Sequence, residues 1–169
     1  MDFNQIISPY PGLRPFTEAE GLYFKGREKH IRKIQEELSA ERYLMVTGAS
    51  GDGKSSLIYA GLLPNIYAGF YRGELGRWKV AVLRPGHHPL DNLASALSVA
   101  FKGSEAADIK EKIKYGYSAL ADYYTSSDLY VDNTSDEFLA LDEKEQKRAL
   151  RKGSNLLIVV DQFEEFFTN

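Results

Sequence analysis

The apolar positions of two segments recur three or four residues apart, with charged or polar residues between them. This spacing places the apolar side chains on one face and predicts two amphipathic helices, over 27–38 and over 89–101. Their apolar residues are Ile31, Ile34 and Leu38 in the first segment, and Leu90, Leu93, Leu97 and Phe101 in the second. A third helix is predicted over 54–63, and Pro64 is expected to end it because proline donates no backbone hydrogen bond.

Three short apolar runs lack the helical spacing and predict strands, at 43–47, 78–83 and 156–160. The run at 156–160 has no polar residue on either face, which is typical of a central strand covered on both sides in a parallel sheet. Strands that alternate with helices predict an α/β fold with a parallel sheet.

The stretch 103–155 is predicted to be a helical excursion between the second and third strands. Its apolar residues expected on one helical face are Ile109, Ile113, Tyr117 and Leu120. A later, highly charged helix is expected to begin near Thr134, with Glu137 as its capping-box partner, and to end at Gly153. We expect this charged helix to be solvated.

Composition excludes several classes of protein. With 43% hydrophobic residues among 169, the chain has enough apolar content for one compact domain. The formal net charge of −3, without a basic block, argues against nucleic-acid binding. The absence of cysteine excludes a disulfide framework. The longest apolar run has five residues, against the ~20 that cross a bilayer. Because no secretory leader follows Met1, we expect a cytoplasmic protein with no membrane segment.

The glycine-rich stretch 48–55 lies between a predicted strand and a predicted helix. Its sequence, GASGDGKS, matches the pattern G-x-x-x-x-G-K-[ST] of a phosphate-binding loop, in which successive backbone N–H groups surround an anion. Lys54 is expected to reach the β- and γ-phosphates, Ser55 to ligate Mg²⁺, and Ser56 to contact the α-phosphate. The nucleotide-binding residues predicted in this stretch are Gly48, Ser50, Gly51, Gly53, Lys54, Ser55 and Ser56.

An acidic segment follows the third predicted strand. Asp161 stands at the carboxyl end of that strand, where its carboxylate would hold the Mg²⁺ water shell opposite Ser55. Gln162 fills the next position and cannot act as a base. Glu164 and Glu165 are therefore both candidates for the residue that orients or deprotonates the attacking water, and the sequence does not choose between them.

Four blocks of the sequence together resemble the STAND ATPases (signal transduction ATPases with numerous domains), specifically the novel bacterial type often fused to WD-repeat propellers. These blocks are PGLRPF at 11–16 with FKGRE at 24–28, the phosphate loop (Walker A) and its helix at 48–64, RPG at 84–86 with the following Pro89 and Leu90, and VVDQFEEFF (Walker B) at 159–167. Each block is short, and it is their combination that is specific.

The resemblance implies ATP and Mg²⁺ as cofactors. It also implies that Phe24, Gly26 and Arg27 cover the adenine and ribose of the nucleotide, although the same residues could simply form the turn that opens the first helix. Asp52 stands where the family has a small neutral residue. Because an acid there would repel phosphates, we expect Asp52 to point to solvent.

The fold implied by the resemblance is the three-layer sandwich of P-loop NTPases, with a five-stranded parallel sheet in the order 5-1-4-3-2. The chain ends eight residues after Asp161, so we expect a fold truncated after the Walker B strand and a fragment of a longer protein. Residues 1–26, with three prolines and a glycine between 8 and 16, are expected to form an extended segment, and 27–169 a partial NTPase core. The missing neighbours would be replaced by direct pairing of strands one and three, by rearrangement, or by another chain in an oligomer formed through the open sheet edges.

The expected function is ATP and Mg²⁺ binding by the N-terminal portion of a STAND-type signal-transduction NTPase. This portion would act as a nucleotide-dependent switch with little hydrolysis of its own, alongside the remaining NTPase and sensor domains. No N-K-x-D motif for guanine is present, which favours ATP over GTP. The alternative is a degenerate P-loop fold that serves as a protein-interaction module through the tyrosine-rich stretch 115–130.

Overall fold

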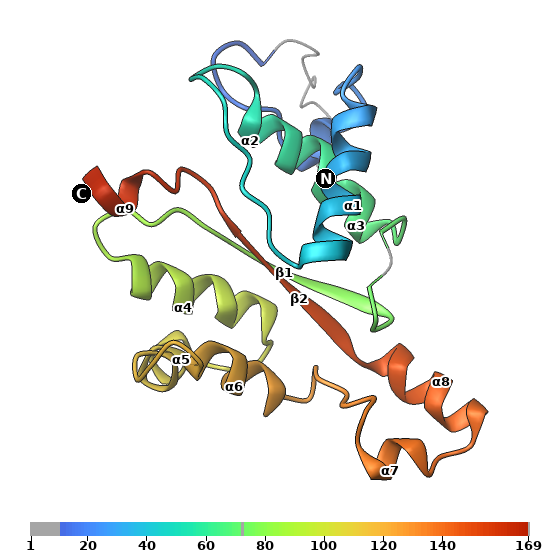
Figure 1. The fold of residues 1–169 in the computed structure, drawn as a ribbon. Helices are drawn as coiled ribbons and strands as arrows, with labels where there is room; N and C mark the ends of the chain where they lie inside the picture. The colour runs from blue at the N-terminus through green and yellow to red at the C-terminus, as the bar shows by residue number, and fades with distance from the viewer. Residues whose placement is uncertain (1–10, 72, 169) are drawn as a thin grey trace, which may run out of the picture. The chain divides into compact units, whose positions relative to one another are not determined.

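The structure, a computed structural model, describes residues 11–71 and 73–168, which fall into two compact units that divide after Tyr71. Residues 1–10, which include part of the predicted extended segment, lie outside the described residues. The elements of both units are labelled in Figure 1.

The first unit contains helices joined by long loops. Its elements are the 3₁₀ helix η1 (Glu18–Glu20), α1 (Glu28–Glu41), α2 (Lys54–Ser56), the π-helix η2 (Leu57–Leu62) and α3 (Leu63–Tyr67). The amphipathic helix predicted over 27–38 is confirmed by α1, in which Ile34 is buried. Residues 11–16 form no helix or strand, as expected from their prolines.

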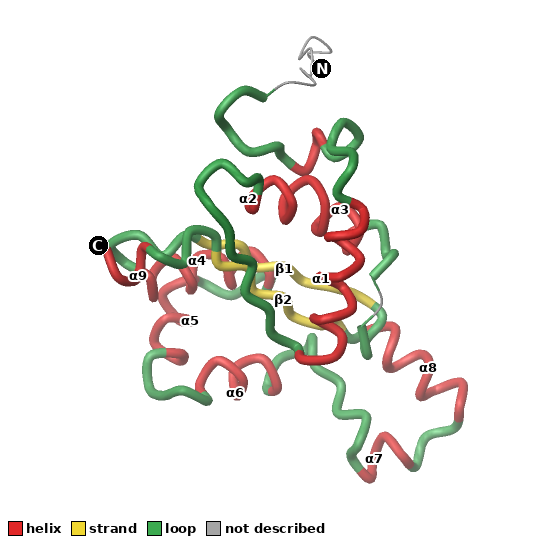
Figure 2. Tube along the Cα trace, turned by 45° about the horizontal axis from the view of Figure 1, so that its top comes forward, coloured by secondary structure: helices red, strands yellow, loops and turns green. Residues whose placement is uncertain are grey.

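The prediction of a strand over 43–47 is wrong. These residues are not part of any strand in the structure, and Figure 2 shows a continuous loop between α1 and α2. Burial still alternates, because Leu44 and Val46 are half-buried while Tyr43 and Met45 are 68% and 55% exposed. The apolar pattern is therefore present, but a strand also requires a neighbour that accepts and donates its hydrogen bonds. The described sheet contains two strands only, so the proposed direct pairing of strands one and three is not observed among the described residues.

Pro64 does not end the helix that follows the phosphate loop. It lies at the second position of α3, directly after the π-helix η2. Proline in a helix normally collides with the carbonyl four residues earlier, here that of Ala60. That carbonyl lies next to Gly21, where an added Cβ would be only 2.9 Å from it. The wider π-turn and this glycine together accommodate the proline, so the helix continues to Tyr67.

The second unit is built on two parallel strands, β1 (Arg77–Leu83) and β2 (Ser154–Val160), whose register runs from Arg77 opposite Ser154 to Leu83 opposite Val160. They confirm the strands predicted at 78–83 and 156–160. Their direct pairing agrees with the adjacency of strands two and three that the resemblance implies. An α/β fold with a parallel sheet is therefore present, while the three-layer arrangement stays a prediction.

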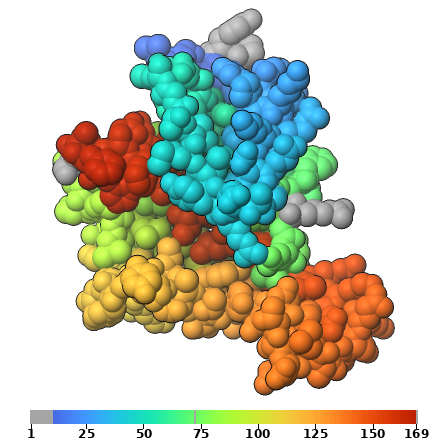
Figure 3. All heavy atoms as spheres, in the orientation of Figure 1, coloured from blue at the N-terminus to red at the C-terminus, as the bar shows by residue number. Residues whose placement is uncertain are grey.

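The crossover between the two strands is helical. Its helices are α4 (Pro89–Ala100), α5 (Ala106–Ile113), α6 (Ala119–Thr125), α7 (Asp136–Leu139) and α8 (Glu143–Lys152), and α9 (Glu165–Thr168) follows β2. Figure 1 shows α4 beside the sheet, with α5 and α6 beyond it. In Figure 3 the atoms of α7 and α8, in orange, form a lobe that stands out from the rest of this unit.

The core of the second unit lies where α4 packs on β1 and α5 packs on α4. Its buried residues are Ala81, Ala94, Leu97, Ala100, Phe101, Ile109 and Ile113. Small alanines on both the strand and the helix let the two backbones approach closely. Leu156 and Ile158 pack against this cluster, yet β2 beyond Ser154 is half-buried rather than fully buried. This differs from the expectation that both faces of this strand are covered.

Two details of the excursion differ from the prediction. The helical face expected to include Tyr117 ends earlier, because α5 stops at Ile113 and Tyr117 is fully exposed. The single charged helix expected from Thr134 is two helices. Ser135 caps the first, and Asp142 caps the second in a capping box with Glu145. Because a second capping motif, formed by the acidic residues Asp142 and Glu145, follows soon after the cap at Ser135, the segment forms two helices instead of one.

Candidate functional site

The glycine loop of the first unit has the backbone that the phosphate-loop pattern requires. Gly51 and Gly53 have φ angles of +87° and +81°, a region that residues with a Cβ rarely adopt. No atom lies within 4 Å of the Cβ that would be added at either position, so glycine is required here by the backbone conformation and not by a lack of space. Gly53 is the residue before α2, so the loop leads directly into a helix.

The lysine of the loop is held by the loop itself. Lys54 Nζ donates to the carbonyl oxygens of Gly48 and Ala49, both at 2.9 Å. The side chain therefore folds back over the start of the loop, and two of the three N–H donors of its ammonium group bind backbone carbonyls. Ser50, also predicted to contact nucleotide, is exposed in the same loop.

Asp52 does not point to solvent, contrary to the expectation from its charge. Its Oδ2 accepts the backbone N–H of Ala49 at 2.7 Å, across the loop. A backbone N–H in an open glycine loop lacks a partner in regular structure, and a carboxylate is its strongest available acceptor. The gain from this charge-assisted hydrogen bond explains why the acid turns inward, although the residue remains exposed.

The two serines after the lysine have different surroundings. Ser55 is half-buried in the first turn of α2. Ser56 is 8% exposed, and its Oγ accepts the backbone N–H of Phe16 at 3.1 Å. This bond connects the 11–16 block to the helix of the phosphate loop, so Ser56 has a structural contact besides its predicted role toward phosphate.

The 11–16 block is also anchored by an ion pair. Arg14 donates from both Nη atoms to the carboxylate of Glu20, at 2.7 and 2.5 Å, and the backbone N–H of Thr17 donates to the same carboxylate at 2.8 Å. The Arg14 guanidinium, followed by the Thr17 N–H, lowers the pKa of Glu20 from its ordinary 4.5 to about 2. Glu20 is buried, so these bonds also satisfy a carboxylate that has little water around it.

The block predicted to cover the adenine and ribose forms the turn that opens α1. Phe24 packs its ring 5.6 Å from that of Phe16 and lies beside Gly61 of η2. The Gly26 N–H donates to Glu28 at 3.0 Å. Arg27 caps α1, and its Nη2 lies 3.5 Å from the carbonyl oxygen of Asp52. Arg27 thus extends to the phosphate loop, while nucleotide contact by Phe24, Gly26 and Arg27 stays a prediction.

In the second unit, Asp161 directly follows β2 and is paired with an arginine that the sequence reasoning missed. Its backbone N–H donates to the carbonyl oxygen of Leu83 at 2.9 Å, which continues the backbone hydrogen bonding between the two strands by one residue. Its Oδ2 accepts from Nε and Nη2 of Arg84, at 3.1 and 3.0 Å. The signal was present in the parallel register: since Leu83 lies opposite Val160, the residues that follow the two strands, 84 and 161, must be neighbours.

The structure distinguishes the two glutamates that the sequence could not. Glu165 is half-buried, and its Oε2 accepts the Gly86 N–H at 2.9 Å, whereas Glu164 is exposed. Gln162, between Asp161 and these glutamates, has a φ of 58°, so the chain turns sharply after the strand. Both Asp161 and Glu165 are thus bound to the 84–86 segment.

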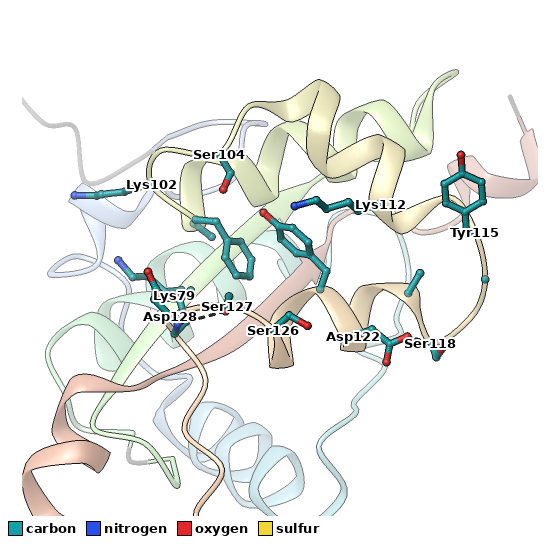
Figure 4. Close-up of a pocket in the computed structure, with 16 residues that line it drawn as sticks. Lys79, Lys102, Ser104, Lys112, Tyr115, Ser118, Asp122, Ser126, Ser127 and Asp128 are labelled. Carbon is teal, nitrogen blue, oxygen red and sulfur yellow. Dashed lines mark hydrogen bonds between the residues drawn. The ribbon is translucent and has the colours of Figure 1, made fainter.

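A separate cleft of about 790 Å³ lies in the second unit, between the end of α4, α5 and α6. Figure 4 shows three lysines around it, Lys79, Lys102 and Lys112, together with serine and tyrosine hydroxyls. Lys112 Nζ is 5.3 Å from the centre of the Tyr123 ring. The residues that line the cleft include none of those predicted to bind nucleotide.

The predicted residues fit a nucleotide with Mg²⁺ by the chemistry of their donors. The Ser55 hydroxyl and the Asp161 carboxylate are the oxygen ligands that Mg²⁺ prefers, and Mg²⁺ commonly uses only one or two protein ligands besides water and phosphate. In the described part of the chain, no three His, Cys, Asp or Glu side chains gather into a metal site. Ser55 lies in the first unit and Asp161 in the second, so their meeting around one ion stays a prediction.

Comparison with known proteins places the chain in a family. Residues 9–169 match the model of the family described as Novel STAND NTPase 1. No curated protein and no solved structure matches the chain. Among the residues that the structure describes, no helix combines the length and apolar character needed to cross a membrane. Since the family model covers almost the entire sequence, this chain belongs to the Novel STAND NTPase 1 family.

Proposed function

We propose that this chain binds ATP together with Mg²⁺ and acts as the nucleotide-dependent switch of a STAND NTPase. The observation that carries the proposal is the glycine loop 48–53, with its two positive φ angles, leading into a helix that begins with Lys54, in a chain of an NTPase family. Backbone N–H groups and a helix N-terminus favour anions, and the lysine adds a positive charge.

The roles follow from the chemistry of each side chain. Lys54 donates to two backbone carbonyls and would use its third N–H for phosphate oxygens, and Ser55 and Asp161 would hold Mg²⁺. When bound, the ion would neutralise phosphate charge. Glu165 is the better candidate for orienting water, because the Gly86 N–H fixes its carboxylate while Glu164 is exposed.

We expect binding with little turnover from this chain alone. Asp161 is paired with Arg84, and Lys54 uses two of its three N–H donors on its own loop, so both charges already have partners within the protein. Exchange of these partners for nucleotide is the kind of two-state change that a switch requires. In a longer STAND protein, the remaining NTPase and sensor domains would read out that change.

Titration calorimetry with ATP, with and without Mg²⁺, tests the proposal. Lys54→Ala should weaken ATP binding by about 10- to 100-fold, the usual value of hydrogen bonds to a charged group. Lys33→Ala, which removes an exposed lysine of α1, is the matched control and should bind like the wild type. If the wild type does not bind ATP, or if Lys54→Ala binds equally well, the nucleotide proposal is wrong and an interaction module becomes the better interpretation.

A further inference from the structure

We propose that Asp52 is a built-in competitor of the nucleotide phosphates and lowers the affinity of the loop for ATP. This inference rests on the proposed function, and it concerns a residue that a phosphate-binding loop does not need. It starts from the finding that the Asp52 carboxylate turns into the loop and accepts the Ala49 N–H at 2.7 Å.

The carboxylate occupies the space over the beginning of the loop. A Cβ added to Gly48 would lie 2.9 Å from Asp52 Oδ2, so the oxygen lies directly against that residue. The Ala49 N–H is one of the backbone donors that the loop would otherwise offer to an anion. An anion that uses this donor must first displace the carboxylate.

The same two residues also hold the lysine. Lys54 Nζ is bound to the carbonyl oxygens of Gly48 and Ala49, while Asp52 is bound to the N–H of Ala49. The backbone at the start of the loop therefore binds two side chains. The Ala49 N–H donates to the Asp52 carboxylate, and the Gly48 and Ala49 carbonyl oxygens accept from the Lys54 ammonium group. An anion that takes the Ala49 N–H has to break the hydrogen bond of Asp52, whereas Lys54 still has a third N–H to donate to phosphate.

Charge acts in the same direction. Once displaced, the Asp52 carboxylate stays near the loop and repels a polyphosphate, an effect that salt screens because the residue is exposed. The hydrogen bond and the charge can be separated by two variants. Asp52→Asn keeps an oxygen acceptor of the same size without the charge, whereas Asp52→Ala removes both.

The experiment compares Mg²⁺–ATP binding by the wild type, Asp52→Asn and Asp52→Ala in titration calorimetry. We expect Asp52→Ala to bind about two- to tenfold more tightly, the range that corresponds to one net hydrogen bond, with Asp52→Asn between it and the wild type. Glu37→Gln, which removes an exposed acid from α1, is the matched control and should leave affinity unchanged. The amide resonance of Ala49 in ¹⁵N spectra should shift in Asp52→Ala without nucleotide.

The outcomes distinguish this inference from the function on which it rests. If the wild type binds ATP and both Asp52 variants bind with equal or lower affinity, Asp52 only stabilises the loop and the inference is overturned, while the proposed function stands. If none of the proteins binds ATP, both fail. Because the two substitutions lie in an exposed loop, circular dichroism should show a folded protein in each case.

Discussion

The pair formed by Arg84 and Asp161 is predicted to stabilise the second unit measurably. Arg84→Ala removes both donors to Asp161 Oδ2, at 3.1 and 3.0 Å. The Asp161 side chain is only 11% exposed, so little water can replace the arginine, but Arg84 itself is 51% exposed and already partly solvated. Fully exposed pairs contribute about 0.2–1 kcal/mol, and hydrogen bonds to charged groups about 1.5–3 kcal/mol. We therefore expect a coupling free energy of about 1–2 kcal/mol between the two side chains.

A double-mutant cycle measures this coupling. The wild type, Arg84→Ala, Asp161→Ala and the double variant are unfolded with urea, and the intrinsic fluorescence of Trp78 is followed. Trp78 is the single tryptophan of the chain and lies on β1, so its signal reports the second unit. Arg77→Ala, at the opposite end of the same strand, is the matched control and should change the free energy of unfolding by less than about 0.5 kcal/mol.

The cycle isolates the pair from the other contacts of each residue, because those contacts are lost in the single variants as well. A coupling free energy below about 0.3 kcal/mol would contradict the ion pair described here. Raising the salt concentration should reduce the coupling only modestly, since one partner is largely shielded from solvent.

Two further predictions concern packing and pH. Leu97→Ala, which empties a fully buried position of α4, should lower the free energy of unfolding by about 3 kcal/mol in the Trp78 assay. Val99→Ala on the exposed side of α4 is its control, and similar losses in both would refute the assigned core. Because the pKa of Glu20 is lowered from 4.5 to about 2, its stabilising contribution is present above pH 4.5 and lost as the pH falls through 2. The difference in melting temperature between wild type and Glu20→Gln, followed by circular dichroism, should shrink over that interval, and a constant difference would exclude the ion pair with Arg14.

Local signals predicted helix α1 and the glycine loop well. The spacing of Ile31, Ile34 and Leu38 depends only on neighbours along the chain, and so does the placement of glycines around Lys54. The strand expected at 43–47 failed because a strand also depends on a partner distant in sequence, which the apolar pattern cannot supply.

The side-chain partners of the candidate site were harder to predict. The charge of Asp52 suggested that its side chain points to solvent, but its carboxylate instead accepts the Ala49 N–H across the loop. Arg84 became visible as a partner of Asp161 only after the two strands were placed in register. The choice between Glu164 and Glu165 likewise required the Gly86 N–H, which lies on another segment.

The π-turn after the phosphate loop changes the direction in which the following side chains project. A π-turn contains one residue more than an α-turn, which rotates everything beyond it by about 100° around the helix axis. Four consecutive residues, Ala60 to Leu63, are buried here, which a regular amphipathic helix with one apolar face would not allow. The segment therefore needs packing partners on more than one side. A deletion of one residue between 57 and 62 would restore regular α-geometry but misalign Pro64 and the buried Ile66 with the surroundings they now fit.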